Sequence, residues 1–382
     1  MPTTIEISFD EPLATYFPGE TVSGRVHVHV DKPKRIRAVS IKFSGDASVW
    51  WSEDRTSCRT GENSRRDEDW IYKAKEKYFR HTLYFVGGES GMVTLDAGDH
   101  TYPFQYLLPQ TLPNSFEGKH GYVRYTAKAT ISRWWSVKTR VAFTVKSVVD
   151  LSMIPQAEEP VERVQSKDFT RHWGESPGGP LTMGVRIPRG GYFPGQTIPL
   201  LIKVDNASSI DVLNVRGALI QVVTWHADED NNTLESVERV VDLVFDCPVP
   251  ANKCKAFCQE ITVPPVLPSH LDNCSIIDLE YFLAVTARVS GAHFNLEIKA
   301  PILIGTAPEA EKSLEEKTFA EKSLSEKSLP DKSLRSLPDK SLPDKSLPGP
   351  GDVAHPRGSL GLPSPDLLPP SYEESVLGQH QR

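Results

Sequence analysis

The stretch YFPGE at Tyr16–Glu20 returns almost unchanged as YFPGQ at Tyr192–Gln196. In both copies Pro-Gly predicts a type II turn, because proline sets the backbone angle of the second turn position and glycine accepts the positive φ of the third. Alternating apolar and polar residues follow each turn, which is the pattern of a half-buried strand. The residues on the apolar faces of these two strands are Val22, Gly24, Val26, Val28 and Val30, and Ile198, Leu200, Ile202 and Val204. Pro199 lacks an N–H, so we expect the second strand at a sheet edge.

A second landmark follows each copy in the same order. Leu112-Pro113 precedes Tyr125, and Leu267-Pro268 precedes Tyr281, and each tyrosine begins another alternating strand. Two landmarks in one order predict two copies of one domain. The first copy is longer, and its extra residues fall in the polar run Ser52–Asp69, which we interpret as a long exposed loop.

Short alternating runs separated by turn signals continue through both copies, and no stretch has a long helical period. This pattern predicts an all-β protein with two tandem β-sandwich domains, at residues 1–147 and 181–305. Residues 148–180 lose the periodicity and are interpreted as a linker. Residues 306–382 contain six KSL tripeptides, mostly at five-residue intervals, which fit neither a helix nor a strand. We expect a disordered tail there, because little apolar surface is available to offset the ordering entropy.

Composition limits the class of protein. The 382 residues carry a net charge of −7, which argues against general nucleic-acid binding. Because no apolar run approaches the ~18 residues of a membrane span and no signal-peptide pattern is seen, we expect a cytoplasmic protein with reduced cysteines. The sequence contains no P-loop, GxGxxG or GxSxG motif, so we expect neither an enzyme nor a bound cofactor.

Cysteines and histidines offer weak candidates for a site. Cys247, Cys254 and Cys258 lie close together, but no second cysteine pair or suitably spaced histidine completes a zinc site, so no metal is expected. A thiol redox role remains open for them. His27 and His29 share the polar face of a predicted strand and are interpreted as exposed strand residues rather than ligands.

Two further features have a structural and a functional interpretation. The basic run KPKRIR at Lys32–Arg37 is first of all a solvated turn, and alternatively it contacts anionic lipid or phosphorylated receptor tails. In the pairs Trp50-Trp51 and Trp134-Trp135, a strand would place one ring in the core and one outside. The outer rings either pack locally or form a contact patch.

The sequence near its end contains Pro369-Pro370-Ser371-Tyr372, a PPxY motif. Two prolines hold the chain near polyproline II, so little entropy is lost when it docks on an aromatic groove. The ring of Tyr372 can enter a neighbouring pocket with its hydroxyl hydrogen-bonded. These determinants match the ligand of a WW domain, and the alternative, in a chain with 31 prolines, is a chance match.

A set of stretches across residues 4–305 resembles the arrestin family. Its members are ISFDEP, YFPGETVSGRV, LPQTLPNSFEGKHGYVRY, PPVLPSHLDNCSIIDLEY and PILIGTAP. The PPxY motif is similar to that of the α-arrestins, although many α-arrestins carry two such motifs and one is found here. The resemblance implies two arrestin-like β-sandwiches, and it implies that Pro369, Pro370 and Tyr372 contact the WW domains of HECT-type ubiquitin ligases.

The resemblance also implies a function. The protein would be an adaptor that links membrane receptors or transporters to the ligase and promotes ubiquitination, endocytosis and endosomal sorting. It would be cytoplasmic and recruited to plasma membrane and endosomes through its cargo. The alternative is a trafficking scaffold that acts without a ligase. One relative binds thioredoxin through a cysteine, but the sequence around Cys254 does not match well enough to transfer that activity.

Overall fold

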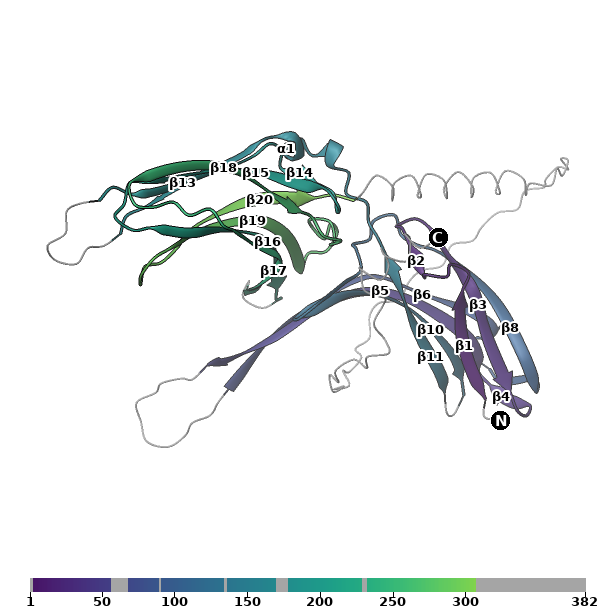
Figure 1. Cartoon of the computed structure of the whole chain (residues 1–382). Helices are drawn as coiled ribbons and strands as arrows, with labels where there is room; N and C mark the ends of the chain where they lie inside the picture. The colour runs from purple at the N-terminus through teal and green to yellow at the C-terminus, as the bar shows by residue number, and fades with distance from the viewer. Residues whose placement is uncertain are drawn as a thin grey trace, which may run out of the picture.

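The structure is a computed structural model that describes residues 3–55, 68–88, 91–133, 136–169, 178–228 and 232–306. Its regular elements are almost all β-strands, and they form two sandwiches that contact each other (Figure 1). The predicted all-β fold with two tandem sandwiches is therefore confirmed. Residues 307–382 lie outside the described residues, so the expected disordered tail stays a prediction.

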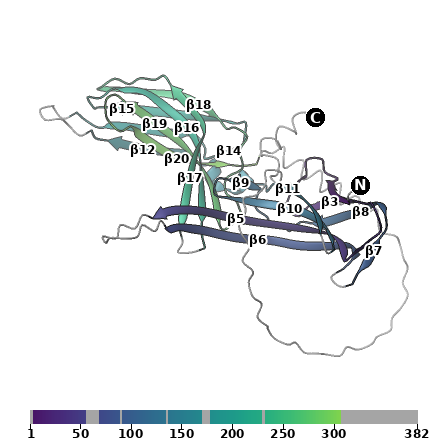
Figure 2. The ribbon, with the colours of Figure 1, turned by 90° about the horizontal axis from the view of Figure 1, so that it is seen from below.

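The N-terminal sandwich has two main sheets. The first sheet contains, in spatial order, β1 (Thr4–Phe9), β3 (Thr21–Val30) and β8 (Gly98–Leu107). The second contains β2 (Thr15–Tyr16), β11 (Val137–Val145), β10 (Gly121–Ser132), β5 (Ala38–Arg55) and β6 (Glu68–Gly87), with β9 (Phe116–Gly118) paired to β10. A small separate sheet joins β4 (Lys34–Ile36) to β7 (Val93–Leu95). Figure 2 shows β5 and β6 as long neighbouring strands that extend beyond the other strands of the N-terminal sandwich.

The C-terminal sandwich repeats this plan. One sheet contains β12 (Val161–Lys167), β13 (Leu181–Ile187), β15 (Thr197–Asn206) and β18 (Lys253–Thr262). The other contains β14 (Gly191–Tyr192), β20 (Leu296–Ile304), β19 (Ile277–Val289), β16 (Val212–His226) and β17 (Thr233–Phe245). Apart from the added strand β12, and from β4, β7 and β9 of the N-terminal domain, which have no counterpart here, the order of strands matches that of the N-terminal sandwich, as the duplicated landmarks predict.

The repeated pentapeptide builds the same turn twice. Gly19 and Gly195 have φ of 81° and 85°, the positive values that a type II turn requires. In the first turn the Phe17 N–H donates to Glu20 Oε2 at 2.7 Å, and in the second the Phe193 N–H donates to Gln196 Oε1 at 3.1 Å. The short strands β2 and β14, which enter these turns, pair in parallel with β11 and β20.

The second landmark also has one physical cause in both domains. The Tyr125 hydroxyl donates to the Pro113 carbonyl at 2.7 Å, and the Tyr281 hydroxyl donates to the Leu267 carbonyl at 2.9 Å. Each bond ties the strand that carries the tyrosine to the Leu-Pro segment before it, and the expectation that the tyrosine begins that strand is wrong, because β10 begins at Gly121 and β19 at Ile277. The duplication is thus a repeated pair of local hydrogen-bonded structures, and it explains why Tyr and Leu-Pro recur at similar spacing.

The predicted inner faces are confirmed. The apolar residues of β3, β10, β15 and β19 that the alternation assigned to one face are all buried in the core. On β10 these are Tyr125, Ala127, Ala129 and Ile131, and on β19 they are Tyr281, Leu283, Val285, Ala287 and Val289. Alternation with period two therefore identified the core-facing side of these strands correctly.

The expectation that Pro199 marks an edge strand is wrong for the strand as a whole. Strand β15 lies between β13 and β18. Its pairing with β13 starts only at Leu201, whereas its pairing with β18 includes Pro199. Pro199 therefore lies where β15 has a single neighbour, and a residue without an N–H is tolerated there.

Two polar segments contain more strand than the sequence suggested. The expected loop Ser52–Asp69 is wrong at both ends, because β5 continues to Arg55 and β6 begins at Glu68. Residues 148–180, expected to be a linker, contain β12, which pairs with β13 over its whole length. In both cases backbone hydrogen bonds hold the strand, and side chains that face solvent leave no apolar alternation to detect.

Candidate functional site

The PPxY residues Pro369, Pro370 and Tyr372 lie outside the described residues, so their role stays a prediction. The structure does describe the residue from which that segment departs. The Thr306 N–H donates to the Val149 carbonyl at 3.0 Å, and the Val149 N–H donates to Thr306 Oγ1 at 2.9 Å. Val149 belongs to the connection between the two sandwiches, so the described part of the chain ends, at Thr306, beside that connection.

The contact between the domains is centred on Trp225 at the end of β16. This side chain is 1% exposed, and its ring packs on Phe116 and His120 of the N-terminal sandwich, with ring centroids 5.8 and 6.0 Å away. A methyl group at Gly118 would come within 2.5 Å of the Trp225 ring, so glycine is needed there for the close approach. The Trp225 Nε1–H donates to Ser236 Oγ at 3.0 Å, which fixes the ring orientation.

Strand β6 makes the second contact between the domains. Glu76 Oε2 accepts from the N–H of Ser275 at 2.9 Å and from its hydroxyl at 3.2 Å. The Lys73 carbonyl accepts from the Asp228 N–H at 3.2 Å. The Tyr78 hydroxyl lies beside the Cys274 thiol, and burial raises the pKa of both groups, so both are neutral at physiological pH. The C-terminal sandwich therefore contacts the middle of β6, from Lys73 to Tyr78.

A cavity of about 550 Å³ lies at this junction. Its lining combines β5, β6, the β9–β10 turn and β17, through Trp50, Trp51, Ser52, Glu53, Ile71, Lys119, His120 and Leu234. Burial, and secondarily the charge of Lys119, lowers the pKa of His120, which favours its neutral form. The lining combines aromatic and aliphatic side chains with the charged Glu53 and Lys119, a mixture that suits a side chain of a partner protein better than a reacting group.

The paired tryptophans at the edge of the cavity behave as expected. Trp51 is buried and stacks on Tyr72 with ring centroids 5.2 Å apart, whereas Trp50 is 39% exposed. One ring is thus in the core and one is outside, as predicted for a strand. Trp134-Trp135 lies outside the described residues.

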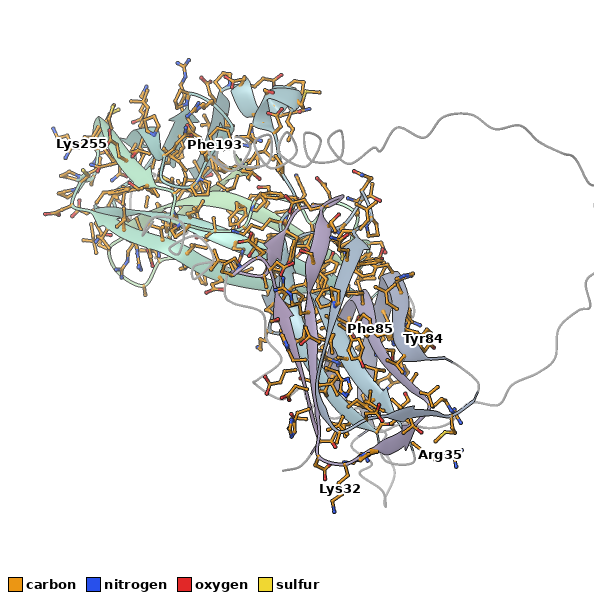
Figure 3. All side chains as sticks on the ribbon, turned by 90° about the vertical axis from the view of Figure 1, so that its right-hand side faces the viewer. Lys32, Arg35, Tyr84, Phe85, Phe193 and Lys255 are labelled. Atoms are coloured by element: carbon orange, nitrogen blue, oxygen red, sulfur yellow. The ribbon has the colours of Figure 1, made fainter. Side chains whose placement is uncertain are left out.

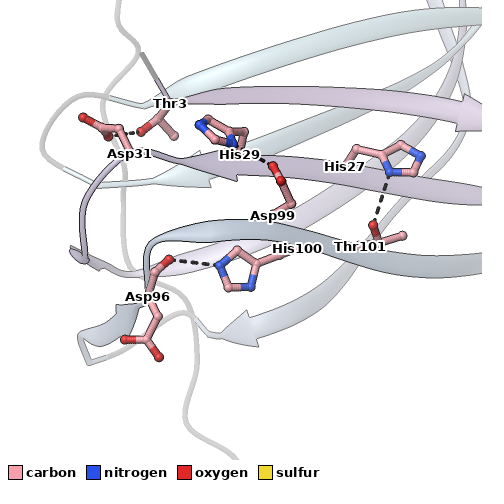
Figure 4. Close-up of polar contacts among 8 residues, drawn as sticks. All are labelled: Thr3, His27, His29, Asp31, Asp96, Asp99, His100 and Thr101. Carbon is pink, nitrogen blue, oxygen red and sulfur yellow. Dashed lines mark hydrogen bonds and ion pairs between the residues drawn. The ribbon is translucent and has the colours of Figure 1, made fainter. Parts of the chain in front are cut away.

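His27 and His29 lie on the outer face of β3, as expected for strand residues. Figure 4 shows His29 Nδ1 bonded to Asp99 Oδ1 at 2.6 Å and His27 Nδ1 bonded to the Thr101 hydroxyl at 3.3 Å. Each ring is thus engaged by a residue of the neighbouring strand β8. Among the described residues, no three His, Cys, Asp or Glu side chains are grouped to hold a metal ion.

The basic run Lys32–Arg37 has a largely structural environment. Ile36 is fully buried, and the Lys34 ammonium pairs with Asp31 and with the Thr3 hydroxyl. The exposed Lys32 and Arg35 lie at the end of the N-terminal sandwich that is remote from the C-terminal sandwich (Figure 3). Lys34–Ile36 form strand β4, so the interpretation of the whole run as a solvated turn is wrong, and its exposed side chains are the cations Lys32, Arg35 and Arg37.

The cysteines near β18 do not converge on a site. Cys254 and Cys258 are exposed on this edge strand, and Cys247 accepts a long contact of 3.9 Å from Gln259 Nε2. All three are free thiols. In the described part of the chain, no helix has the length and apolar character needed to cross a membrane.

Comparisons with known proteins agree with the duplicated architecture. The family model for the arrestin (or S-antigen) N-terminal domain matches residues 5–152, and that for the arrestin (or S-antigen) C-terminal domain matches residues 177–309. Arrestin domain-containing protein 17 of Caenorhabditis elegans is 29% identical over 81% of this chain and 72% of its own length. Human arrestin domain-containing protein 4 is 30% identical over 78% of this chain and 70% of its own, and human arrestin domain-containing protein 1 is 29% identical over 78% and 64%.

Proposed function

The chain belongs to the arrestin family, as an arrestin domain-containing protein of the α-arrestin group, and on that premise we propose that it is a non-enzymatic trafficking adaptor. Its two sandwiches bind the cytoplasmic part of a membrane receptor or transporter. Its PPxY motif recruits a HECT-type ubiquitin ligase through a WW domain, and ubiquitination of the cargo leads to endocytosis and endosomal sorting. The protein is cytoplasmic until cargo brings it to the plasma membrane or to endosomes.

The observation that supports this proposal most is the combination of two folded sandwiches, which contact each other, with a PPxY motif far along the following segment. Thr306 is held at the connection between the domains, and Pro369 lies well beyond it in the sequence. If the intervening residues behave as the flexible chain that their composition predicts, their r.m.s. reach is roughly 45 Å. A ligase bound to the motif then reaches lysines on cargo and adaptor because the flexible chain keeps its effective concentration near them high. No fixed interface between ligase and sandwiches is needed.

The test is titration calorimetry of the full chain against isolated WW domains of HECT ligases. We expect a Kd of about 1 μM, or about −8 kcal/mol, for the single motif. Tyr372→Ala is expected to weaken binding at least about 30-fold, because it removes a buried aromatic anchor. Ser371→Ala is the matched control, since the x position of the motif is variable, and both variants should unfold at the wild-type temperature.

Unchanged WW binding by Tyr372→Ala would refute the adaptor mechanism. A second experiment addresses the scaffold alternative. In a pull-down, a chain without residues 307–382 loses ligase partners if the proposal is right. If that shortened chain keeps every partner, the protein acts instead as a trafficking scaffold independent of a ligase.

A further inference from the structure

Three cations stand side by side on the outer face of the N-terminal sheet. Lys128 on β10 is directly opposite Lys42 on β5 and Arg140 on β11. Directly opposed residues of antiparallel strands point to the same face with Cβ atoms about 4.5–5.5 Å apart, and like charges at these positions destabilise a sheet. Nothing in the packing of the core requires this arrangement, so it calls for an explanation outside the fold.

More cations extend the same face. On β6 the residues Lys73, Lys75, Lys77 and Arg80 are exposed and oppose Trp50, Ser48, Asp46 and Ser44 of β5, which lie on the same side of β5 as Lys42. Lys138 of β11 opposes Thr130, two residues along β10 from Lys128. We call this set the cationic face, and its members are Lys42, Lys73, Lys75, Lys77, Arg80, Lys128, Lys138 and Arg140.

Few acids compensate these charges. Among the described side chains of β5, β6, β9, β10 and β11, two acids share this face, Asp46 and Glu117. Glu117 is occupied by Arg124, whose Nε and Nη2 donate to its two carboxylate oxygens at 2.6 and 2.7 Å. Asp46 is half-buried, and burial raises its pKa despite the surrounding cations. No member of the cationic face forms an ion pair with a described acidic side chain.

The pKa values of two central lysines reflect the crowding. Burial lowers the pKa of Lys128, and the charges of Arg140, Lys138 and Lys42 lower it further. Burial lowers the pKa of Lys42 too, followed by the charges of Arg80 and Arg140. An anionic ligand on this face would relieve the repulsion between these groups, so the charge distribution is complementary to an anion.

Apolar side chains continue the cationic face toward the hairpin. Trp50 opposes Lys73, and Ile71 opposes Ser52, so both lie on the same side of the sheet as the lysines. Ile71 is 63% exposed. Exposed tryptophan and aliphatic groups beside a field of lysines are typical of surfaces that rest on a bilayer, where rings sit at the headgroup level.

We propose that the cationic face binds the headgroups of anionic phospholipids, so that the N-terminal sandwich docks directly on a membrane surface. The cations span four strands, roughly 15 Å across the sheet, and Lys73 to Arg80 extends roughly 23 Å along it. Charge spread over such an area fits several headgroups at once rather than one ligand held at a point. This contact involves neither cargo nor the PPxY motif, and it goes beyond the proposed adaptor function.

The test is co-sedimentation of the full chain with large vesicles. We expect the chain to bind vesicles of phosphatidylcholine with 30% phosphatidylserine about tenfold or more tightly than pure phosphatidylcholine, and to dissociate as salt increases. Two triple variants, K42E/K128E/R140E and K73E/K75E/K77E, should each reduce the partition coefficient at least about tenfold. The second variant changes only exposed side chains of β6, so it remains informative if the first is poorly folded by circular dichroism.

The matched control has the same change of charge on the other domain. Lys203, Lys253 and Lys255 are exposed on β15 and β18, and K203E/K253E/K255E should retain most of the binding. Equal loss in this control, or equal binding to vesicles without phosphatidylserine, would overturn the proposal.

A second control separates this proposal from the adaptor mechanism and from a protein ligand. Tyr372→Ala should bind vesicles like the wild type, because the PPxY motif has no part in the lipid contact. If the chain does not bind vesicles and instead binds a polyglutamate peptide through the same lysines, the cationic face binds an acidic protein segment and the lipid proposal is wrong.

Discussion

The outer faces of the two equivalent sheets differ far more than their inner faces. Tyr125 and Tyr281 hold the same place in the two domains, so Lys128 of β10 corresponds to Ala284 of β19, three residues later in each strand. Around Lys128 the neighbours are Lys42 and Arg140, whereas around Ala284 they are Ala218 and Lys299. The C-terminal face carries a small buried apolar cluster of Ala218, Ile220 and Ala284 with Phe282 packed against it.

This difference shows which side chains the fold requires and which it does not constrain. The inner faces of both sheets are apolar because they form the core, and any charged residue there would be desolvated. The outer faces share the backbone pairing but not the side chains, one being cationic and the other partly apolar. Binding functions of the two domains are therefore expected to differ, although their architecture is the same.

The largest effect is expected where the domains agree. Phe143 opposes Tyr125 and Ile302 opposes Tyr281, and both side chains are buried. Phe143→Ala should lower the free energy of unfolding of its domain by about 3–5 kcal/mol, and Ile302→Ala by about 2–5 kcal/mol, through loss of packing. Hydrogen exchange read separately in each domain measures both values, and a cost near zero at either position would show that the inner faces are not equivalent.

A smaller effect is expected from the repeated tyrosine bond. Tyr125→Phe leaves the Pro113 carbonyl without its donor and should lower the free energy of unfolding by about 1–3 kcal/mol. Tyr281→Phe should lower the free energy of unfolding by about 1–3 kcal/mol as well, because it leaves the Leu267 carbonyl without its donor. The Tyr281 hydroxyl also accepts from Gln221 Nε2 at 2.9 Å, and the variant loses that bond too. Denaturant titration compares the two, with the exposed Tyr84→Phe as the control that should be neutral. If only one variant is destabilised, the bond is structural in one domain alone.

The smallest effect is expected where the domains differ. Lys128→Ala introduces the residue type found at Ala284 and should change stability by no more than about 0.5 kcal/mol near pH 7, because lost packing is offset by relief of repulsion.

The pH dependence of that variant has a defined sign. The pKa of Lys128 is lower in the folded than in the unfolded protein, so the unfolded state binds more protons between the two values and wild-type stability rises with pH there. Over the alkaline range below the ordinary lysine pKa of about 10.4, the wild type should therefore gain stability relative to the variant as pH rises. Denaturant titrations of both proteins across this range measure the difference, in which the shared contribution of buried tyrosines cancels. If the difference in stability instead shifts in favour of Lys128→Ala as pH rises, the pKa of Lys128 is not lowered in the folded protein.

Alternation of apolar residues was sufficient to predict the core of the fold. The faces headed by Tyr125 and Tyr281 are buried as predicted, because the period of a strand is set by its own backbone. Strand β12 and the outer parts of β5 and β6 escaped detection, since polar residues on both sides of a strand leave no periodic signal. The edge assignment of Pro199 failed because local pairing, and not the position of the whole strand, decides where proline fits.

The sites were harder to predict than the fold. The contact of Trp225 with Phe116 joins residues far apart in the sequence, and nothing local to either residue marks it. The alternating lysines of β6 are visible in the sequence, but the juxtaposition of Lys42, Lys128 and Arg140 depends on the register of three strands. For the PPxY motif the order is reversed. A short linear motif can be found in the sequence alone, whereas its residues lie outside the described structure.

The hydrogen bonds between Thr306 and Val149 have a mechanical consequence. If a partner bound to residues 307–382 pulls on them, the force acts on the folded domains at Thr306, beside the connection between the two sandwiches. Strand β20 lies between β14 and β19, so a pull on it is opposed by hydrogen bonds to two neighbours rather than to one. If the proposed adaptor function is right, force applied through residues 307–382 would therefore reach the protein next to a strand that is paired on both sides.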